Sequence, residues 1–508
     1  MSEETRTEGS LTARAFWLVF AKTLAFAFGF VLPMLLVRRL SQKEYGLYKQ
    51  AFLVVGTAAS ILPLSFGLSA FYFLPRERER RGAVVLNVML FNLAVGGAAL
   101  LALVLRPGLL GAIFNSPGLI PYAPLVGLLT LLWIISYFVE VVAVANNESR
   151  VSTIFIIVAQ LTKTALLLGA TLFYTTVGAL LVAAVVQGLL QTGALLVYLR
   201  SRFGPFWRDF DWPVMRRQLA YALPFGSAAI LYVVLTDLHN YFVSYRFGEE
   251  AFAVYAIGCF SLPLVGIIME SVGSLMVSRV SQLQSAGDRR GIITVTAGAM
   301  RKLSAIYFPL YALLLVTGPE LIAFLFTDRY RASWPVFAIN LTALPFNILV
   351  SDPILRAHAE HRYYLLKVRA VTLPVLFGAL WLGTTYFGLV GAITAMVSVN
   401  ILDKLIEAFK AWSIVGVTRR DAVLLKDVGK VAGAAAAAGC VAAGVRMLLP
   451  GAHPFVVLAV CGAAFSCVYL ALVWLLGVPT PQERGALRGK IEGALRLAWW
   501  RRASEPVV

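Results

Sequence analysis

Long apolar runs recur along almost the whole chain of 508 residues, and they restrict its fold more than any other feature. Each run is about 20 residues long, the length that an α-helix needs to cross the hydrocarbon core of a bilayer. Charged residues make up only 14% of the chain, whereas soluble domains contain roughly 25%. We therefore predict an all-α, polytopic membrane protein whose function resides in its helical bundle.

The apolar runs predict fourteen membrane spans, near 16–37, 46–70, 83–105, 119–144, 151–174, 177–199, 219–243, 251–276, 303–326, 333–355, 364–386, 389–410, 431–449 and 454–477. Lys and Arg concentrate in alternate connecting segments. With those at span ends assigned to the nearer side, 32 lie on the side of the N-terminus and 9 on the other. Because cytoplasmic segments are rich in Lys and Arg, both termini are predicted to be cytoplasmic.

An internal repeat divides the spans into two groups. A shift of 207 residues aligns VRRLSQKEYGLYKQAF (37–52) with SYRFGEEAFAVYAIGC (244–259), so that Arg39 meets Arg246. Six spans separate the copies, which would make the repeat parallel; chance similarity of two membrane turns is the alternative. We predict a cytoplasmic tail (1–15), an N-lobe of six spans (16–200), a cytoplasmic connector (201–218), a C-lobe of six spans (219–412), two further spans (413–477) and a basic cytoplasmic tail (478–508).

Ionisable residues inside spans identify candidate site residues, because each costs about 2.5–3.5 kcal/mol at the bilayer centre on insertion scales. Lys163 lies near the middle of its span, which contains no acidic residue, and Lys22 lies about two turns inside the first span. Both are candidate contacts to an anionic substrate headgroup; snorkelling, or an ion pair such as one with Glu140, is the alternative. Arg39 and Arg246, at the predicted outer mouth, are further headgroup candidates or plain interfacial anchors.

Two other groups of charged residues suggest coupling and gating. Asp237 and His239 lie towards the outer end of one span, and they are candidates for binding a coupling ion unless tyrosine hydroxyls or water merely satisfy them. Glu140, Glu270 and Arg279 are gate candidates, although Arg279 also fits a simple excess of cytoplasmic positive charge. The sequence predicts no cofactor other than Na⁺ or H⁺ as the coupling ion.

Several segments together resemble the polysaccharide (O-antigen and exopolysaccharide) flippase branch of the multidrug/oligosaccharidyl-lipid/polysaccharide (MOP) exporter superfamily. They are VRRLSQKEYGLYKQAF, then LSFGLSAFYFLPRERERRG (64–82), and YALPFGSAAILYVVLTDLHNYFVSYRFGEEAFAVYAIG (221–258). The resemblance implies a two-lobed bundle in the bacterial cytoplasmic (inner) membrane, whose central cavity opens alternately to each side. It also implies a polyprenyl-pyrophosphate-linked oligosaccharide as substrate, with membrane lipids and the polysaccharide polymerase or export machinery as partners.

The remaining function classes fit less well. No phosphate-cradling GxxxxGK[ST] loop indicates an ATP-driven pump, and the clustered basic residues reflect topology rather than nucleic-acid binding. No metal site is predicted, because the cysteines lie in apolar segments without a CxxC pair. The outward loops carry few ionisable groups for catalysis, which disfavours a membrane glycan polymerase or ligase and predicts no enzyme. A cation-coupled multidrug exporter of the same superfamily is the closer alternative, and Glu140 is the residue that favours it.

Overall fold

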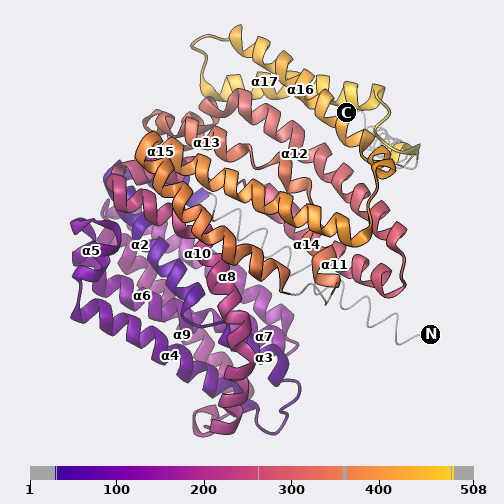
Figure 1. The fold of residues 1–508 in the computed structure, drawn as a ribbon. Helices are drawn as coiled ribbons and strands as arrows, with labels where there is room; N and C mark the ends of the chain where they lie inside the picture. The colour runs from indigo at the N-terminus through magenta and orange to yellow at the C-terminus, as the bar shows by residue number, and fades with distance from the viewer. Residues whose placement is uncertain (1–28, 30, 261, 359–362, 482, 486–508) are drawn as a thin grey trace, which may run out of the picture. The chain divides into compact units, whose positions relative to one another are not determined.

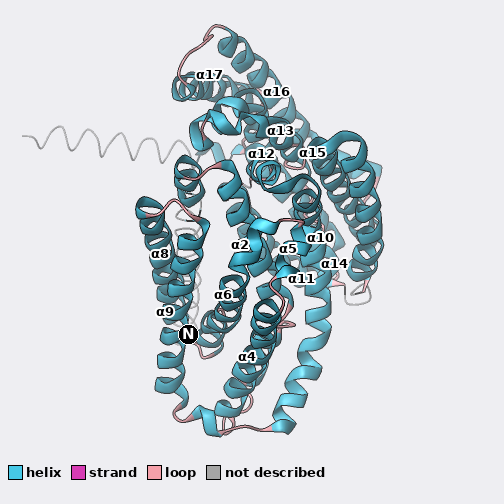
Figure 2. Cartoon of the chain, turned by 90° about the vertical axis from the view of Figure 1, so that its left-hand side faces the viewer, coloured by secondary structure: helices cyan, strands magenta, loops and turns pink. Residues whose placement is uncertain are grey.

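The computed structural model describes residues 29, 31–260, 262–358, 363–481 and 483–485. Regular structure in this part of the chain is entirely helical (Figure 2). Nine helices among these residues are long and apolar enough to cross a membrane, or ten if one bent helix pair counts as a single span. The all-α membrane fold is therefore confirmed, whereas the count of fourteen spans stays a prediction.

Contacts between Cα atoms divide the chain into two units. Unit 1 comprises Met1–Ser271, Ile322–Asn340 and His358–Ile406, and unit 2 comprises Val272–Leu321, Leu341–Ala357 and Glu407–Val508. Both units are discontinuous in sequence, so several helices begin in one unit and end in the other. The predicted division into lobes of six, six and two spans is a separate hypothesis about repeats, and it stays a prediction.

The described residues from Gln42 to Ser285 form ten α-helices and three short 3-10 helices, all of which lie in unit 1 except for the later part of α11. They are α2 (Gln42–Ile61), η1 (Phe66–Leu68), α3 (Ser69–Phe73), α4 (Arg81–Leu105), α5 (Gly108–Phe114), η2 (Pro117–Tyr122), α6 (Ala123–Ser136), α7 (Phe138–Ala145), α8 (Ser149–Phe173), α9 (Val177–Phe203), η3 (Phe206–Arg208), α10 (Trp212–Gly258) and α11 (Pro263–Ser285), whose last part enters unit 2. Before α2, residues 31–39 are also helical.

The second half of the chain contains fewer and longer helices. They are α12 (Arg289–Phe326), η4 (Asp328–Ser333), α13 (Trp334–Leu341), η5 (Pro345–Ile348), α14 (Asp352–Ala357), α15 (Tyr364–Val415), η7 (Arg419–Leu425), α16 (Lys426–Met447) and α17 (Pro454–Leu475). Two long helices are broken at a glycine with positive φ, α10 at Gly248 (φ 76°) and α15 at Gly388 (φ 59°). Each of them therefore covers residues of two predicted spans.

The predicted span 333–355 is not a continuous helix. The run 333–355 was expected to cross the bilayer, but α13 ends at Leu341 and is followed by η5 and the short α14. Proline explains the break, because Pro345 has no N–H to donate to the carbonyl of Leu341 and its ring clashes with the preceding turn. Pro353 then lies inside the first turn of α14.

Unit 1 is built around α6. This helix packs against α4, α2 and α9, and Figure 1 shows α2, α4 and α6 as neighbours in the indigo to purple part of the chain. A core of buried apolar residues from η1, α3, α4, α7 and α9 stabilises unit 1, including Phe66, Val84 and Val142. Apolar burial contributes less in lipid than in water, so close van der Waals packing carries most of the stability here.

The polar connector between α9 and α10 is tied to the loop that precedes α4. Asp211 caps α10 by accepting a hydrogen bond from the Val214 backbone N–H (3.0 Å), and its other carboxylate oxygen lies 2.9 Å from the guanidinium of Arg80. Arg217 forms a second ion pair with Glu77 at 2.8 Å. Caps of this kind stabilise a helix by about 1 kcal/mol. Asp211 therefore fixes the start of α10 and also joins it to the loop that precedes α4.

In unit 2, α16 and α17 pack side by side and against α12 (Figure 1). Arg446 of α16 donates from Nη2 to the carboxylate of Glu320 in α12 at 2.9 Å, and from Nη1 to the Val316 carbonyl at 2.7 Å. The Tyr469 hydroxyl of α17 donates to the Ala305 carbonyl at 2.9 Å. Polar contacts between helices are favoured in apolar surroundings, where water offers no competing partner.

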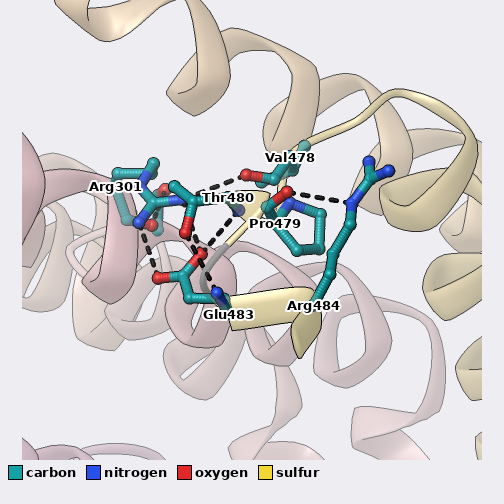
Figure 3. A network of polar contacts seen from close by, with 7 residues as sticks. Arg301, Val478, Pro479, Thr480, Glu483 and Arg484 are labelled. Carbon is teal, nitrogen blue, oxygen red and sulfur yellow. Dashed lines mark hydrogen bonds and ion pairs between the residues drawn. The ribbon is translucent and has the colours of Figure 1, made fainter. Parts of the chain in front are cut away.

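The segment after α17 is held to α12 by Arg301 (Figure 3). Arg301 donates to both carboxylate oxygens of Glu483, at 2.7 and 3.1 Å, and to the Val478 carbonyl at 3.0 Å. Thr480 and Glu483 form a reciprocal capping box, in which each side chain accepts a hydrogen bond from the backbone N–H of the other residue. Arg301 therefore fixes the turn that leads into the basic tail.

This contact predicts a pH dependence that begins only in acid. The Arg301 guanidinium and the Thr480 backbone N–H lower the pKa of Glu483 from 4.5 to about 2. A lowered folded-state pKa stabilises the fold fully above pH 4.5, and this contribution is lost as the pH falls through about 2. We expect the difference in thermal unfolding midpoint between wild type and Glu483→Gln to be constant near neutral pH and to shrink below pH 4.5. A difference that already shrinks near neutral pH would contradict this contact.

Candidate functional site

A cavity of about 670 Å³ lies within unit 1. Its walls come from α2, α4, α6, α7, α8, α9 and α10, together with the break that follows α2. At that break Leu64 and Ser65 adopt left-handed backbone conformations (φ 48° and 57°). Non-glycine residues in this region cost of order 1–3 kcal/mol each and cluster at functional sites. The cavity is therefore the leading candidate for a binding site.

Lys163 extends into this cavity from the middle of α8. Its Nζ lies 4.7 Å from the ring centroid of Trp133 and 5.9 Å from that of Phe52. Among the described residues, no carboxylate forms an ion pair with Lys163. Cation–π contacts hold an ammonium group by about 0.5–2 kcal/mol, which positions the charge but leaves its N–H donors available to an anion.

Glu140 of α7 lines the same cavity as Lys163. The two residues predicted separately, one as a headgroup contact and one as a gate, are thus brought to a single site. The sequence analysis gave an ion pair between Lys163 and Glu140 as an alternative, and these two residues form no such pair in the described structure. The cavity therefore carries an ammonium group and a carboxylate on its walls, and the two do not pair with each other.

Four carboxamide side chains also line the cavity, and the sequence analysis did not identify them. Gln160 lies on α8, Gln187 and Gln191 lie on α9, and Asn92 lies on α4. A single polar residue in an apolar run gives no clear signal in a sequence. Spacing was the available signal, because Gln187 and Gln191 are four residues apart and share one face of α9.

Helices α2 and α10 pack antiparallel beside this cavity, and we call their contact the α2–α10 seam. The seam consists of Gly46, Gln50 and Thr57 on α2 and of Asp237, Ser244 and Glu249 on α10. Gln50 Nε2 donates to the Ser244 hydroxyl at 2.6 Å in the buried interior. A Cβ atom on Gly46 would overlap the backbone oxygen of Glu249, so only glycine allows this approach. The two copies of the predicted repeat therefore lie in direct contact.

The coupling candidates have separate partners at the seam. Asp237 accepts a hydrogen bond from the Thr57 hydroxyl at 2.8 Å, one helical turn from Val233, which lines the cavity. His239 is buried, and its Nδ1 lies 2.8 Å from the Tyr255 hydroxyl. His239 thus has the tyrosine partner of the structural alternative, whereas Asp237 joins α2 to α10 next to the cavity.

The predicted mouth residues lie outside the cavity. Arg39 is exposed, and Arg246 is exposed and donates to the Thr384 hydroxyl at 3.1 Å. The neighbouring Arg38, which the sequence did not single out, donates to the backbone carbonyls of Leu325 and Phe324, both at 2.7 Å. Neither Arg39 nor Arg246 shares a site with Lys163 in this structure.

The remaining candidates add no residue to the cavity. Arg279 is exposed on α11 and lies 3.4 Å from the amide oxygen of Gln282, one turn further on. Glu270 is exposed on the same helix, and its predicted gate role stays a prediction. Lys22 lies outside the described residues.

Comparisons with known proteins agree with this architecture. The profile of a family described as polysaccharide biosynthesis protein matches residues 35–335. The fold is similar to that of the lipid II flippase MurJ in an inward closed conformation, with a TM-score of 0.72 and 13% identity over 90% of this chain and 98% of that one. It is also similar to an inward-facing MATE transporter of the MOP superfamily (TM-score 0.59, 12% identity, 80% and 96% covered) and to a MATE transporter from Vibrio cholerae (0.57, 16%, 80% and 97%). A comparison with curated proteins gives no match.

Proposed function

We propose that this chain, which belongs to the polysaccharide biosynthesis protein family, is a flippase. Its substrate would be a polyprenyl-pyrophosphate-linked oligosaccharide repeat unit. The protein would move this lipid from the inner to the outer leaflet of the bacterial cytoplasmic membrane by alternating access. One observation carries the proposal: on the wall of a cavity between spanning helices, Lys163 presents a cation that pairs with no carboxylate among the residues the structure describes.

The physical basis is the cost of moving a pyrophosphate through an apolar medium. A charge pair at about 4 Å gains roughly 4 kcal/mol at an effective dielectric constant of 20, against about 1 kcal/mol in water. A lysine that lacks a carboxylate partner offers this energy to an anionic ligand without first breaking an internal ion pair. The Trp133 and Phe52 rings hold the ammonium group in place before the ligand arrives.

Coupling to an ion gradient is part of the proposal, with Asp237 as its site. The Asp237 carboxylate accepts from Thr57 across the α2–α10 seam, so binding of H⁺ or Na⁺ there would change the contact between two helices that border the cavity. An ion shifts a conformational equilibrium only by its difference in affinity for the two states. Asp237→Asn would then reduce transport driven by a gradient without removing the cavity cation.

The second candidate is a cation-coupled multidrug exporter, which Glu140 favours. Glu140 lines the same cavity, and a carboxylate on a cavity wall attracts cationic drugs as Lys163 attracts an anion. The two functions predict opposite losses. Removal of Lys163 would abolish glycan export, whereas removal of Glu140 would abolish drug export.

Complementation tests these alternatives together. The gene is expressed in a strain that lacks its own repeat-unit flippase but makes the matching lipid-linked glycan, and surface polysaccharide is measured alongside resistance to cationic dyes. The proposal expects wild type to restore surface polysaccharide and Lys163→Ala, at equal membrane abundance, to fail. Dye resistance that depends on Glu140, without surface polysaccharide, would overturn it in favour of the exporter.

A further inference from the structure

We infer that the carboxamides that line the cavity form a subsite for the sugar part of the ligand, whereas Lys163 holds its anionic part. This inference rests on the proposed function and adds to it the groups that would recognise the glycan. The subsite consists of Gln187 and Gln191 on α9, Gln160 on α8 and Asn92 on α4, all of which line the cavity.

Helix geometry brings these side chains to one space. Gln187 and Gln191 are four residues apart on α9, and Gln160 and Lys163 are three residues apart on α8, so each pair lies on a single helix face. Helices α8 and α9 pack against one another. The two α9 amides and the α8 amide therefore border the cavity beside the ammonium group.

The hydrogen-bonding groups of the subsite are largely unused within the protein. In the described part of the chain, Gln160, Gln187 and Gln191 form no hydrogen bond, although Gln187 is 3% exposed. Asn92, also 3% exposed, donates to the Ile134 carbonyl at 3.2 Å, but its own carbonyl oxygen is buried without a partner. A buried amide group without a partner costs about 1–3 kcal/mol, and a ligand that supplies the partner recovers this energy.

Carboxamides match sugar hydroxyls in chemistry. Each carboxamide both donates and accepts hydrogen bonds and carries no charge, as a hydroxyl does. Trp133 adds an aromatic ring to the same cavity, and such a ring packs against the apolar C–H face of a pyranose. A purely anionic or purely cationic ligand would use charged groups instead, so the four amides select a hydroxyl-rich, uncharged moiety.

The division between Lys163 and the amides predicts how the protein distinguishes a glycan-bearing lipid from the bare carrier. Lys163 would hold the pyrophosphate of both lipids, whereas the amides would contribute only when sugars are attached. A site built to hydrogen-bond a ligand group rejects the analogue that lacks it, because its own polar groups then stay unpaired. The amides thus favour loaded carrier over empty carrier.

Binding of two defined probes tests the subsite. Purified protein in lipid nanodiscs is titrated with a polyprenyl pyrophosphate that carries a neutral oligosaccharide and with the same polyprenyl pyrophosphate without sugar. We expect Gln187→Leu/Gln191→Leu to weaken binding of the glycosylated probe by about tenfold or more, since each lost hydrogen bond contributes about 0.5–1.5 kcal/mol. Binding of the sugar-free probe should change by less than about twofold.

Three further variants make the outcome decisive. Gln284→Leu makes the same chemical change on α11, outside the cavity, and should leave both affinities at the wild-type value. The single variant Gln191→Leu keeps the test open should the double variant fail to fold, and it should reduce binding of the glycosylated probe alone by a smaller factor. Lys163→Ala should weaken binding of both probes.

The outcomes separate the two proposals. Wild-type binding of both probes with no selective loss in the glutamine variants would overturn the sugar subsite and leave the flippase function intact. An equal loss for both probes would also overturn it, because the glutamines would then act on the cavity as a whole. Failure of wild type to bind either probe would overturn the proposed function itself.

Discussion

Lys163→Ala is expected to reduce transport by about 100-fold while leaving the fold at least as stable as wild type. Removal of one member of a desolvated charge interaction costs about 2–5 kcal/mol in binding, and about 2.7 kcal/mol corresponds to 100-fold. The structure gives Lys163 no ion-pair partner among the described residues, so its loss removes an unpaired charge from apolar surroundings. Transport by the reconstituted protein and its thermal unfolding midpoint measure the two effects.

The opposite signs of these effects distinguish a binding role from a structural one. A lysine that merely supported the fold would lower stability when replaced, and transport would fall in proportion. Lys43→Ala is the matched control, because Lys43 is an exposed lysine at the start of α2 and lies outside the cavity. Unchanged transport in Lys163→Ala would contradict the assignment of Lys163 to the substrate.

Gly46→Ala is expected to destabilise the protein by about 2 kcal/mol or more, although the same change in an open helix is favourable. Alanine is a better helix former than glycine by about 1 kcal/mol. At Gly46, however, the new Cβ atom would overlap the Glu249 backbone oxygen, which cannot move aside as a side chain can. Forcing extra volume into a packed site costs about 1–3 kcal/mol, occasionally more. Thermal unfolding in detergent measures the difference.

Gly97→Ala provides the control for this prediction. Gly97 lies inside α4, and a Cβ atom there would meet no atom within 4 Å. We therefore expect Gly97→Ala to raise the unfolding midpoint slightly or leave it unchanged, and Gly46→Ala to lower it by several degrees. Equal effects of the two substitutions would show that α2 and α10 do not approach closely in the protein.

The fold class was predictable because apolar runs of spanning length recur along the whole chain. Runs of about 20 apolar residues identify spans without any knowledge of their packing. The polysaccharide family predicted from VRRLSQKEYGLYKQAF and its companion segments is confirmed by the family match, and the helical fold is confirmed by the similar structures. Gly46, Gln50 and Ser244 within these segments explain part of their pattern, because they form the contact between α2 and α10.

Helix breaks were harder to predict than helices. Pro345 ends a span that hydropathy alone extends to 355, whereas Pro224 lies within α10 without ending it. Proline removes one hydrogen bond in both cases, and neighbouring helices decide whether the helix continues. That decision depends on tertiary contacts, which a single sequence does not contain.

The sequence predicted only those residues of the site that carry a charge. Lys163 and Glu140 stand out in apolar runs, and the structure places both on one cavity. Gln187 and Asn92 were missed, because uncharged polar residues are tolerated in spans more readily than charged ones and recur for structural reasons. Arg38 rather than Arg39 makes the contacts to backbone carbonyls, because a side chain's neighbours depend on its helix face and not on its charge.

The flippase proposal is tested most directly by lipid translocation in reconstituted vesicles. Protein of uniform orientation is incorporated into liposomes with a fluorescent polyprenyl-pyrophosphate oligosaccharide, and a membrane-impermeant quencher reports which leaflet holds the lipid. We predict that wild type accelerates translocation well above protein-free vesicles and that Lys163→Ala, equally folded, does not. Translocation no faster with folded wild-type protein than in protein-free vesicles, under an imposed ion gradient, would contradict the proposed function.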